Sequence, residues 1–280
     1  MGKPAEDDKE LEDLEVALLL EGVFRRYGYD FRDYSLAHLR RRLRHRLQSS
    51  YLPDLGAMLH RVLSDRNFFE LLLRDLSISV TEMFRDPGVY QRLRTEVVPR
   101  LMTWPFVKIW HAGCATGEEV YSMAILLHEE GLLERCQIYA TDFNQLALKG
   151  AKEGIYSLDQ VRLFTGNYLK GGGRESFSDY YTADDDAVIL KSWLKKRIVF
   201  ADHNLVTDSV FSEVQMVVCR NVLIYFNRDL QQRIFRTFYE SLCPGGILVL
   251  GTKESLQLSG MAELFEPVCP DEKIYKKVPQ

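Results

Sequence analysis

The sequence predicts an α/β protein with a doubly wound, mostly parallel sheet, a small N-terminal all-helical domain and an inserted antiparallel β-subdomain. Beyond residue 100, short apolar runs alternate with amphipathic segments, which is typical of such sheets. The first 76 residues show only helical periodicity, and residues 157–196 interrupt the alternation with glycines and β-favouring pieces. We therefore expect a helical domain at 1–76 and an α/β domain at 77–280, with the subdomain at about 157–196.

Apolar residues spaced three and four apart predict the helices of the first domain. Residues 1 to about 10 are polar, and we expect them to be frayed. Asp33 or Ser35 can cap the second helix. The expected helices cover residues 11–28, 36–47, 55–63 and 67–76.

Asp86 and Pro87 form a favourable N-cap and first-turn pair for a helix that leads to about Arg100. From there the α/β pattern begins. Expected strands are 107–110, 137–140, 197–201, 214–219 and 247–251, and the clearest helices are 118–130 and 228–242.

Composition excludes several classes of protein. The apolar runs are too short to span a bilayer, which needs about 20 residues, and the N-terminus lacks a signal-peptide pattern. Five widely spaced cysteines and six scattered histidines form no ligand spacing. We expect a cytoplasmic protein with reduced thiols, no membrane insertion and no metal.

Charge is distributed asymmetrically along the chain. Residues 1–21 carry eight acidic side chains, whereas five arginines crowd residues 40–46. Such a cluster favours an acidic partner, with a solvated helix face as the alternative. The candidate docking residues are Arg40, Arg41 and Arg44.

The first strand is followed by small residues where a nucleotide-binding turn needs them. Gly113, Ala115 and Gly117 would let a cofactor approach the backbone. A dinucleotide fingerprint is incomplete, because Glu118 stands at its third glycine position. A carboxylate there can bind the ammonium of S-adenosylmethionine, or it is a solvated first-turn acid that favours the helix dipole.

Polar residues also follow the other strands. Asp142 ends the second strand and can accept from both ribose hydroxyls, with a helix N-cap as the alternative. Asn204 and Leu205 follow the third strand and could flank an adenine. Ligands of open α/β sheets bind outside the carboxyl ends of the strands, so these clusters support one another.

The segments SVTEMFRD, GCATGEEVYS, ATDFN, CRNVLIYF and LCPGGILVLGTKE resemble the CheR family of chemotaxis receptor methyltransferases. The resemblance extends over nearly the whole chain and implies a class I S-adenosylmethionine methyltransferase sheet of Rossmann-like type. It also implies transfer to glutamate carboxylates of chemoreceptor cytoplasmic domains, with S-adenosylhomocysteine as product. We expect no nucleic-acid partner. We expect a monomer. The implied cofactor contacts are Ser79, Thr81, Arg85, Glu118, Asp142, Asn204, Leu205, Arg220 and Asn221.

The chain departs from the family pattern at several positions. Ser79 replaces an asparagine, Met83 a phenylalanine and Val120 a proline. Lys253 stands where a serine is usual, so substrate specificity can differ. None of these changes removes the cofactor-binding set.

Methyl transfer to a carboxylate needs no general base, because the nucleophile is already an anion at neutral pH. The protein must align the reacting atoms and exclude water. Arg85 and Tyr225 are the candidates for orienting the substrate carboxylate. The alternatives are a surface arginine at a helix entry and a core tyrosine.

Three other functions compete with this interpretation. Nucleic-acid methylation lacks the proline-containing turn that often assists amine methylation, since Cys219, Arg220, Asn221 and Val222 occupy its place. A nicotinamide dehydrogenase lacks the third fingerprint glycine. The sequence does not exclude a non-catalytic signalling module that binds S-adenosylmethionine or S-adenosylhomocysteine.

Overall fold

The computed structural model describes residues 4–77, 81–257 and 259–278. The chain divides into two compact units. One comprises Met1–Ile78 together with Tyr225–Leu230, and the other comprises Ser79–Ile224 together with Gln231–Gln280. A short segment from the second half of the chain therefore belongs to the helical unit.

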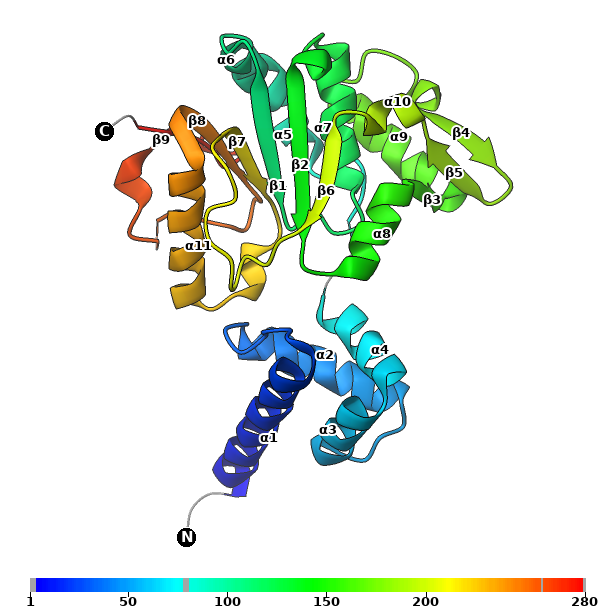
Figure 1. The fold of residues 1–280 in the computed structure, drawn as a ribbon, viewed down its shortest axis with the longest axis vertical. Helices are drawn as coiled ribbons and strands as arrows, with labels where there is room; N and C mark the ends of the chain where they lie inside the picture. The colour runs from blue at the N-terminus through cyan, green and yellow to red at the C-terminus, as the bar shows by residue number, and fades with distance from the viewer. Residues whose placement is uncertain (1–3, 78–80, 258, 279–280) are drawn as a thin grey trace. The chain divides into compact units, whose positions relative to one another are not determined.

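The helical unit contains α1 (Pro4–Tyr27), α2 (Leu36–Ser49), α3 (Leu55–Ser64) and α4 (Arg66–Leu76) (Figure 1). The predicted helices are confirmed. The expected fraying is wrong for residues 4–10, because α1 begins at Pro4, and residues 1–3 lie outside the described residues. Proline suits the first helical turn. Asp54 and Asp65 cap α3 and α4 through backbone N–H groups, whereas Ser35 precedes α2 without a side-chain cap bond.

The second unit is built on a seven-stranded sheet in the order β6-β2-β1-β7-β8-β10-β9. Neighbours from β6 to β8 pair in parallel, as predicted. The strands are β1 (Val107–Ala112), β2 (Cys136–Asp142), β6 (Ile198–Asp202), β7 (Val214–Cys219), β8 (Leu242–Leu250), β9 (Phe265–Cys269) and β10 (Ile274–Lys277).

Strands β9 and β10 were not predicted. Strand β10 pairs antiparallel with both β8 and β9. Both are short and include charged residues, and Pro267 lies within β9, so neither forms an apolar run. Their pairing depends on the edge that β8 provides.

Helices follow the parallel strands as the alternating pattern requires. They include α7 (Glu118–Glu129), α8 (Gln145–Glu153) and α11 (Arg228–Ser241). The helix expected after Pro87 is present, but it is divided into α5 (Pro87–Arg92), a π-helical turn (Leu93–Val97) and α6 (Val98–Leu101). Pro99 has no N–H to donate to the preceding turn, which accounts for the local irregularity.

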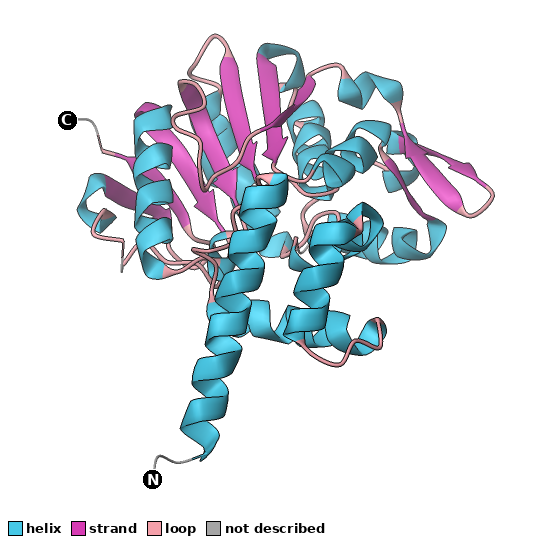
Figure 2. Ribbon diagram, turned by 60° about the horizontal axis from the view of Figure 1, so that its bottom comes forward, coloured by secondary structure: helices cyan, strands magenta, loops and turns pink. Residues whose placement is uncertain are grey.

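The insertion forms a separate three-stranded sheet in the order β3-β5-β4, drawn apart from the main strands in Figure 2. Its strands are β3 (Ile155–Ser157), β4 (Tyr181–Asp184) and β5 (Ala187–Leu190), and all pairs are antiparallel. The strand expected at 187–190 is confirmed. The helices α9 (Val161–Lys170) and α10 (Ser192–Lys195) within this region were not predicted.

The topology identifies where a ligand should bind. From β1 the chain runs to β2 and β6 on one side, and β7 then returns to the other side of β1. The order of the parallel strands reverses between β1 and β7, and ligands of open α/β sheets bind at the carboxyl ends of such strands.

Candidate active site

The turn after β1 requires glycine at two positions. Gly113 has a φ of 78° and Gly117 a φ of 92°. A Cβ atom at Gly113 would lie 2.7 Å from Cγ2 of Val222, and one at Gly117 would lie 2.9 Å from Cβ of Ala151. The N–H of Gly113 also donates to the Thr141 carbonyl over 2.8 Å, which joins this turn to the end of β2. Glycine is therefore required at both positions by the backbone conformation and by the packing of the turn against Val222 and Ala151.

Asp142 lies buried at the end of β2 and stabilises this turn. Its Oδ2 accepts from the Ala115 N–H at 2.8 Å, and its Oδ1 accepts from the Asn144 N–H at 2.9 Å. Burial raises the pKa of Asp142, while these backbone donors act in the opposite direction. The alternative role as a helix cap is wrong, since Asn144 caps α8 with its side chain.

Glu118 is the first residue of α7, and its side chain is buried. Burial raises the pKa of its carboxyl to about 7. Oε2 accepts from the Thr116 hydroxyl at 2.7 Å. No described Lys, Arg or His forms an ion pair with it. The alternative of a solvated first-turn acid is therefore wrong. A buried carboxyl without a cation suits an ammonium ligand.

The neighbouring Glu119 points to a different partner. Its Oε2 lies 2.8 Å from Nη1 of Arg220, and its Oε1 lies 3.2 Å from Nδ1 of His111. The Nη2 of Arg220 also donates to the carboxylate of Asp86 at 2.9 Å and to the Arg85 carbonyl at 3.1 Å. The sequence predicts that Asp86 caps α5. Its side chain instead pairs with Arg220 and makes no cap bond.

Glu254 fixes the segment after β7 and was missed as a site residue. Its buried carboxylate accepts from the N–H groups of Val222, Leu223 and Gly251 at 2.9, 2.8 and 2.5 Å. The adjacent Lys253, which departs from the family pattern, is exposed. A glutamate three residues beyond the glycine that follows a strand was the available signal.

Asn221 begins that segment and adopts a φ of 61°. The turn packs tightly, because a Cβ atom at Gly251 would lie 2.8 Å from the Asn221 nitrogen. Glycine at the end of β8 thus makes room for the backbone at Asn221.

The remaining cofactor candidates are partly buried or not described. Ser79 lies outside the described residues, and Thr81 and Leu205 are half-buried. The side chain of Asn204 accepts from the Val206 N–H at 3.0 Å and so shapes its own turn. Thr81, Asn204 and Leu205 keep their cofactor roles as predictions.

Arg85 and Tyr225 belong to different units. Arg85 is partly exposed, and no described residue forms an ion pair with it. The Tyr225 ring lies edge-on to His38 of α2, with 5.3 Å between ring centroids, and its carbonyl accepts from the Ser35 N–H at 2.8 Å. Tyr225 is only half-buried.

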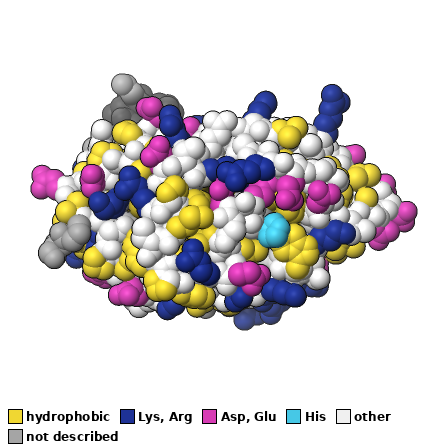
Figure 3. All heavy atoms as spheres, turned by 90° about the horizontal axis from the view of Figure 1, so that it is seen from above, with side chains coloured by type: hydrophobic (Ala, Val, Ile, Leu, Met, Phe, Trp, Pro, Cys, Tyr) yellow, Lys and Arg dark blue, Asp and Glu magenta, His cyan; other side chains and the backbone are white. Residues whose placement is uncertain are grey.

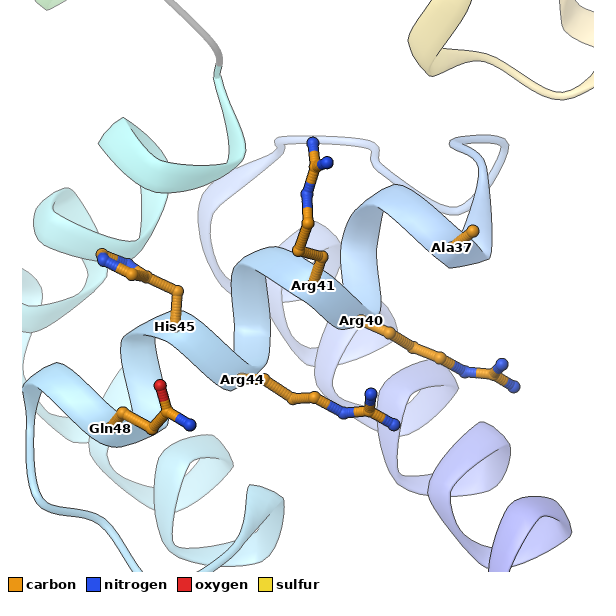
Figure 4. Close-up of a pocket in the computed structure, with 6 residues that line it drawn as sticks. All are labelled: Ala37, Arg40, Arg41, Arg44, His45 and Gln48. Atoms are coloured by element: carbon orange, nitrogen blue, oxygen red, sulfur yellow. The ribbon is translucent and has the colours of Figure 1, made fainter.

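The predicted docking arginines line a surface groove on α2 together with Ala37, His45 and Gln48 (Figure 4). Arg40 and Arg44 project toward α1, where Arg40 pairs with Asp13 and Arg44 pairs with Glu12 at 2.8 Å. Arg41 points another way and is exposed, and no ion pair to it occurs within the described ranges. The acidic α1 therefore neutralises part of the cluster.

Other features bear on the rival functions. Side chains of both signs are interspersed on the face drawn in Figure 3, so that face lacks the uniform positive charge that phosphate binding favours. None of the described helices is long and apolar enough to cross a membrane. The described residues include no group of three or more His, Cys, Asp or Glu placed to hold a metal. All five cysteines are buried and unbonded.

The parallel sheet, the glycine turn and the acids that follow β1 and β2 define a class I S-adenosylmethionine-dependent methyltransferase with an N-terminal helical domain. Residues 79–273 match the CheR methyltransferase SAM-binding domain, and residues 14–77 match the CheR methyltransferase all-alpha domain. The chain belongs to the CheR methyltransferase family.

Curated relatives agree with this assignment. The chain is 53% identical over 265 residues to "Putative methyltransferase Cher3" of Pseudomonas putida, covering 95% of this chain and 97% of that protein. It is 32% identical over 241 residues to "Chemotaxis protein methyltransferase 1" of Vibrio cholerae, with 80% and 82% of the two chains covered. A "Chemotaxis protein methyltransferase" of Listeria monocytogenes is 28% identical over 236 residues, with 84% and 87% covered.

Proposed function

We propose that this protein transfers a methyl group from S-adenosylmethionine to glutamate carboxylates on the cytoplasmic domains of chemoreceptors. The observation that carries the proposal is the buried Glu118, unpaired with any described cation, beside the glycine turn of a CheR-family chain. Relatives named chemotaxis protein methyltransferases support the receptor as substrate.

Each side chain of the site has a proposed role. S-adenosylmethionine supplies a reactive methyl group on sulfur and carries an ammonium and a ribose. Glu118 would bind the ammonium, and Asp142 would accept from the ribose hydroxyls while it holds the Ala115 N–H. Arg85, which no described carboxylate pairs, would orient the anionic substrate. The role of Tyr225 in orienting the substrate stays a prediction from the sequence.

The residues present fit a reaction without a general base. A glutamate side chain is an anion at neutral pH and can attack carbon directly. What the protein must provide is alignment and partial removal of water. A cation such as Arg85 keeps the substrate carboxylate in place while water is excluded.

The α2 groove is the proposed docking surface for the receptor. Arg41 is exposed without a pairing acid among the described residues, so it provides attraction toward an acidic helix. Arg40 and Arg44 would exchange their α1 partners for receptor carboxylates. For Arg44 the exchange has a small electrostatic cost, because an exposed ion pair such as the one with Glu12 contributes only about 0–1 kcal/mol.

The test is to incubate the full chain with methyl-labelled S-adenosylmethionine and candidate receptor cytoplasmic domains from the same cell. A glutamate methyl ester is hydrolysed by brief alkali, so labelled receptor should release volatile methanol. The label should form equally in the presence of a chelator. Alkali-stable label, or label on nucleic acid, would contradict the proposed substrate class. Cofactor binding without transfer to any receptor would favour a non-catalytic signalling module.

A further inference from the structure

The backbone around Arg85 is strained. Phe84 has a φ of 53° and Asp86 a φ of 54°, so two residues with side chains adopt left-handed conformations on either side of Arg85. Such conformations persist only where surrounding contacts enforce them. Phe84 is held by its fully buried ring and by a bond from its N–H to the Ser122 hydroxyl at 2.9 Å. The other half of the turn needs a second anchor.

Arg220 is that anchor. Its Nη2 reaches both the Arg85 carbonyl at 3.1 Å and the Asp86 carboxylate at 2.9 Å. The side chain is only 3% exposed, and its Nε has no hydrogen-bond partner among the described residues. The guanidinium is thus committed to the turn that presents Arg85.

Glu119 in turn fixes Arg220. Its carboxylate lies 2.8 Å from Nη1 of Arg220 and accepts from His111 on its other oxygen when that nitrogen is protonated. Burial alone would raise the pKa of Glu119, but the charge of Arg220 and the contact with His111 lower it, so the carboxylate is ionised. A buried pair of this kind holds its geometry firmly, because separating the two charges is costly.

We propose that Glu119 is a positioning residue that fixes Arg220 and thereby holds the Phe84–Asp86 turn in the conformation that presents Arg85 to the substrate carboxylate. The two adjacent acids at the start of α7 then have separate tasks. Glu118 faces the cofactor side, and Glu119 sets the substrate side. The part that concerns substrate rests on the proposed function, whereas the clamp on the turn does not.

The first measurement is hydrogen exchange of the full-length protein, read by mass spectrometry. In Glu119→Gln the amides of residues 84–89 should exchange at least about fivefold faster, while those of α11 keep their rates. The matched control is Glu134→Gln, which removes an exposed carboxylate 2.7 Å from Arg197 and should change neither segment. Unchanged exchange at 84–89 would overturn the proposal.

The second measurement is receptor methylation. Glu119→Gln should lower kcat by about tenfold to a hundredfold, because small misplacements of an orienting group are that costly. The KM for S-adenosylmethionine should stay within about twofold, since that change leaves Glu118 and Asp142 intact. In an Arg85→Ala background, adding Glu119→Gln should lower kcat by less than a further factor of about two, because the positioned group is already absent.

Fully additive losses in that double variant would show that Glu119 does not act through Arg85. If Glu119→Gln does not melt cooperatively, Arg220→Lys replaces it, since lysine keeps the charge but loses the two-pronged contact. Lysine at this position should give the same faster exchange at 84–89, and unchanged exchange would overturn the clamp. A wild-type chain that transfers no alkali-labile methyl to receptor would refute the proposed function, while hydrogen exchange would still decide on the clamp.

Discussion

At the scale of single residues, the site depends on acids whose surroundings differ. Glu118 and Glu119 are adjacent in the sequence, yet burial raises the pKa of the first to about 7, whereas Arg220 and His111 outweigh burial and lower that of the second. Near neutral pH, Glu118 is therefore partly protonated and Glu119 is charged. Of these two acids, Glu118 is the one whose charge changes in this pH range and could couple cofactor binding to pH.

Affinity for S-adenosylmethionine should consequently depend on pH through Glu118. The ammonium of the ligand needs the carboxylate form, which predominates above a pKa of about 7. As pH falls from 8 to 6, we expect the dissociation constant to rise about tenfold in total. Well below the pKa, the limiting slope is about tenfold per pH unit. Calorimetry in buffers of different ionisation enthalpy should detect proton release on binding at pH 6.5. In Glu118→Gln the affinity should be weaker and nearly independent of pH, and an unchanged pH profile in this variant would refute the assignment.

At the scale of elements, the strand ends are joined through backbone contacts. Gly113 at the end of β1 bonds to Thr141 of β2 and packs against Val222 beyond β7. Glu254 after β8 binds the same post-β7 segment. The carboxyl ends of β1, β2, β7 and β8 thus form one connected structure, which explains why small residues are needed there.

Gly113→Ala should lower the free energy of unfolding by about 2–4 kcal/mol, from backbone strain at positive φ together with overpacking against Val222. Gly245→Ala is the matched control, because Gly245 has a similar φ of 75° but no atom within 4 Å of an added Cβ. That control should lose only about 1–2 kcal/mol. Urea titration measures both. Equal losses would show that the contact with Val222 does not limit this position.

At the scale of the whole molecule, the charge asymmetry of the sequence is partly resolved within the chain. Acidic residues of α1 pair with Arg40 and Arg44 of α2, so the net attraction for an acidic partner is smaller than the arginine count suggests. Arg41 remains exposed in the groove. The arginines of this helix are therefore not equivalent.

Arg41→Glu should reduce receptor methylation more than Arg44→Glu does, because the charge of Arg44 is already paired with Glu12. We expect about a fivefold to tenfold loss in kcat/KM for Arg41→Glu and a loss of about twofold for Arg44→Glu, with cofactor affinity unchanged in both. Wild-type activity should decrease with added salt, which screens exposed charges over about 8 Å at physiological ionic strength. Equal effects of the two substitutions would indicate that α1 releases its partners freely.

Local pattern was sufficient to predict most elements. Apolar patterns predicted the four N-terminal helices and the five parallel strands. A helix that buries one face has apolar residues three and four apart, and a buried strand is a short apolar run. Strands β9 and β10 and the helix α9 escaped prediction. The two strands lack an apolar run, and their pairing is decided by the open edge of β8.

By itself, the sequence determined the fold class, the glycine turn and the acids at the strand ends, since each depends on residues close together along the chain. Only the tertiary structure decided which partners each acid contacts. Glu119, Asp86 and Arg220 are far apart in sequence and meet because β1 and β7 are neighbours in the sheet. Likewise, pairing of Arg40 and Arg44 with α1 follows from helix packing. Charge pairing acts through space over a few ångströms, so residue order alone cannot specify it.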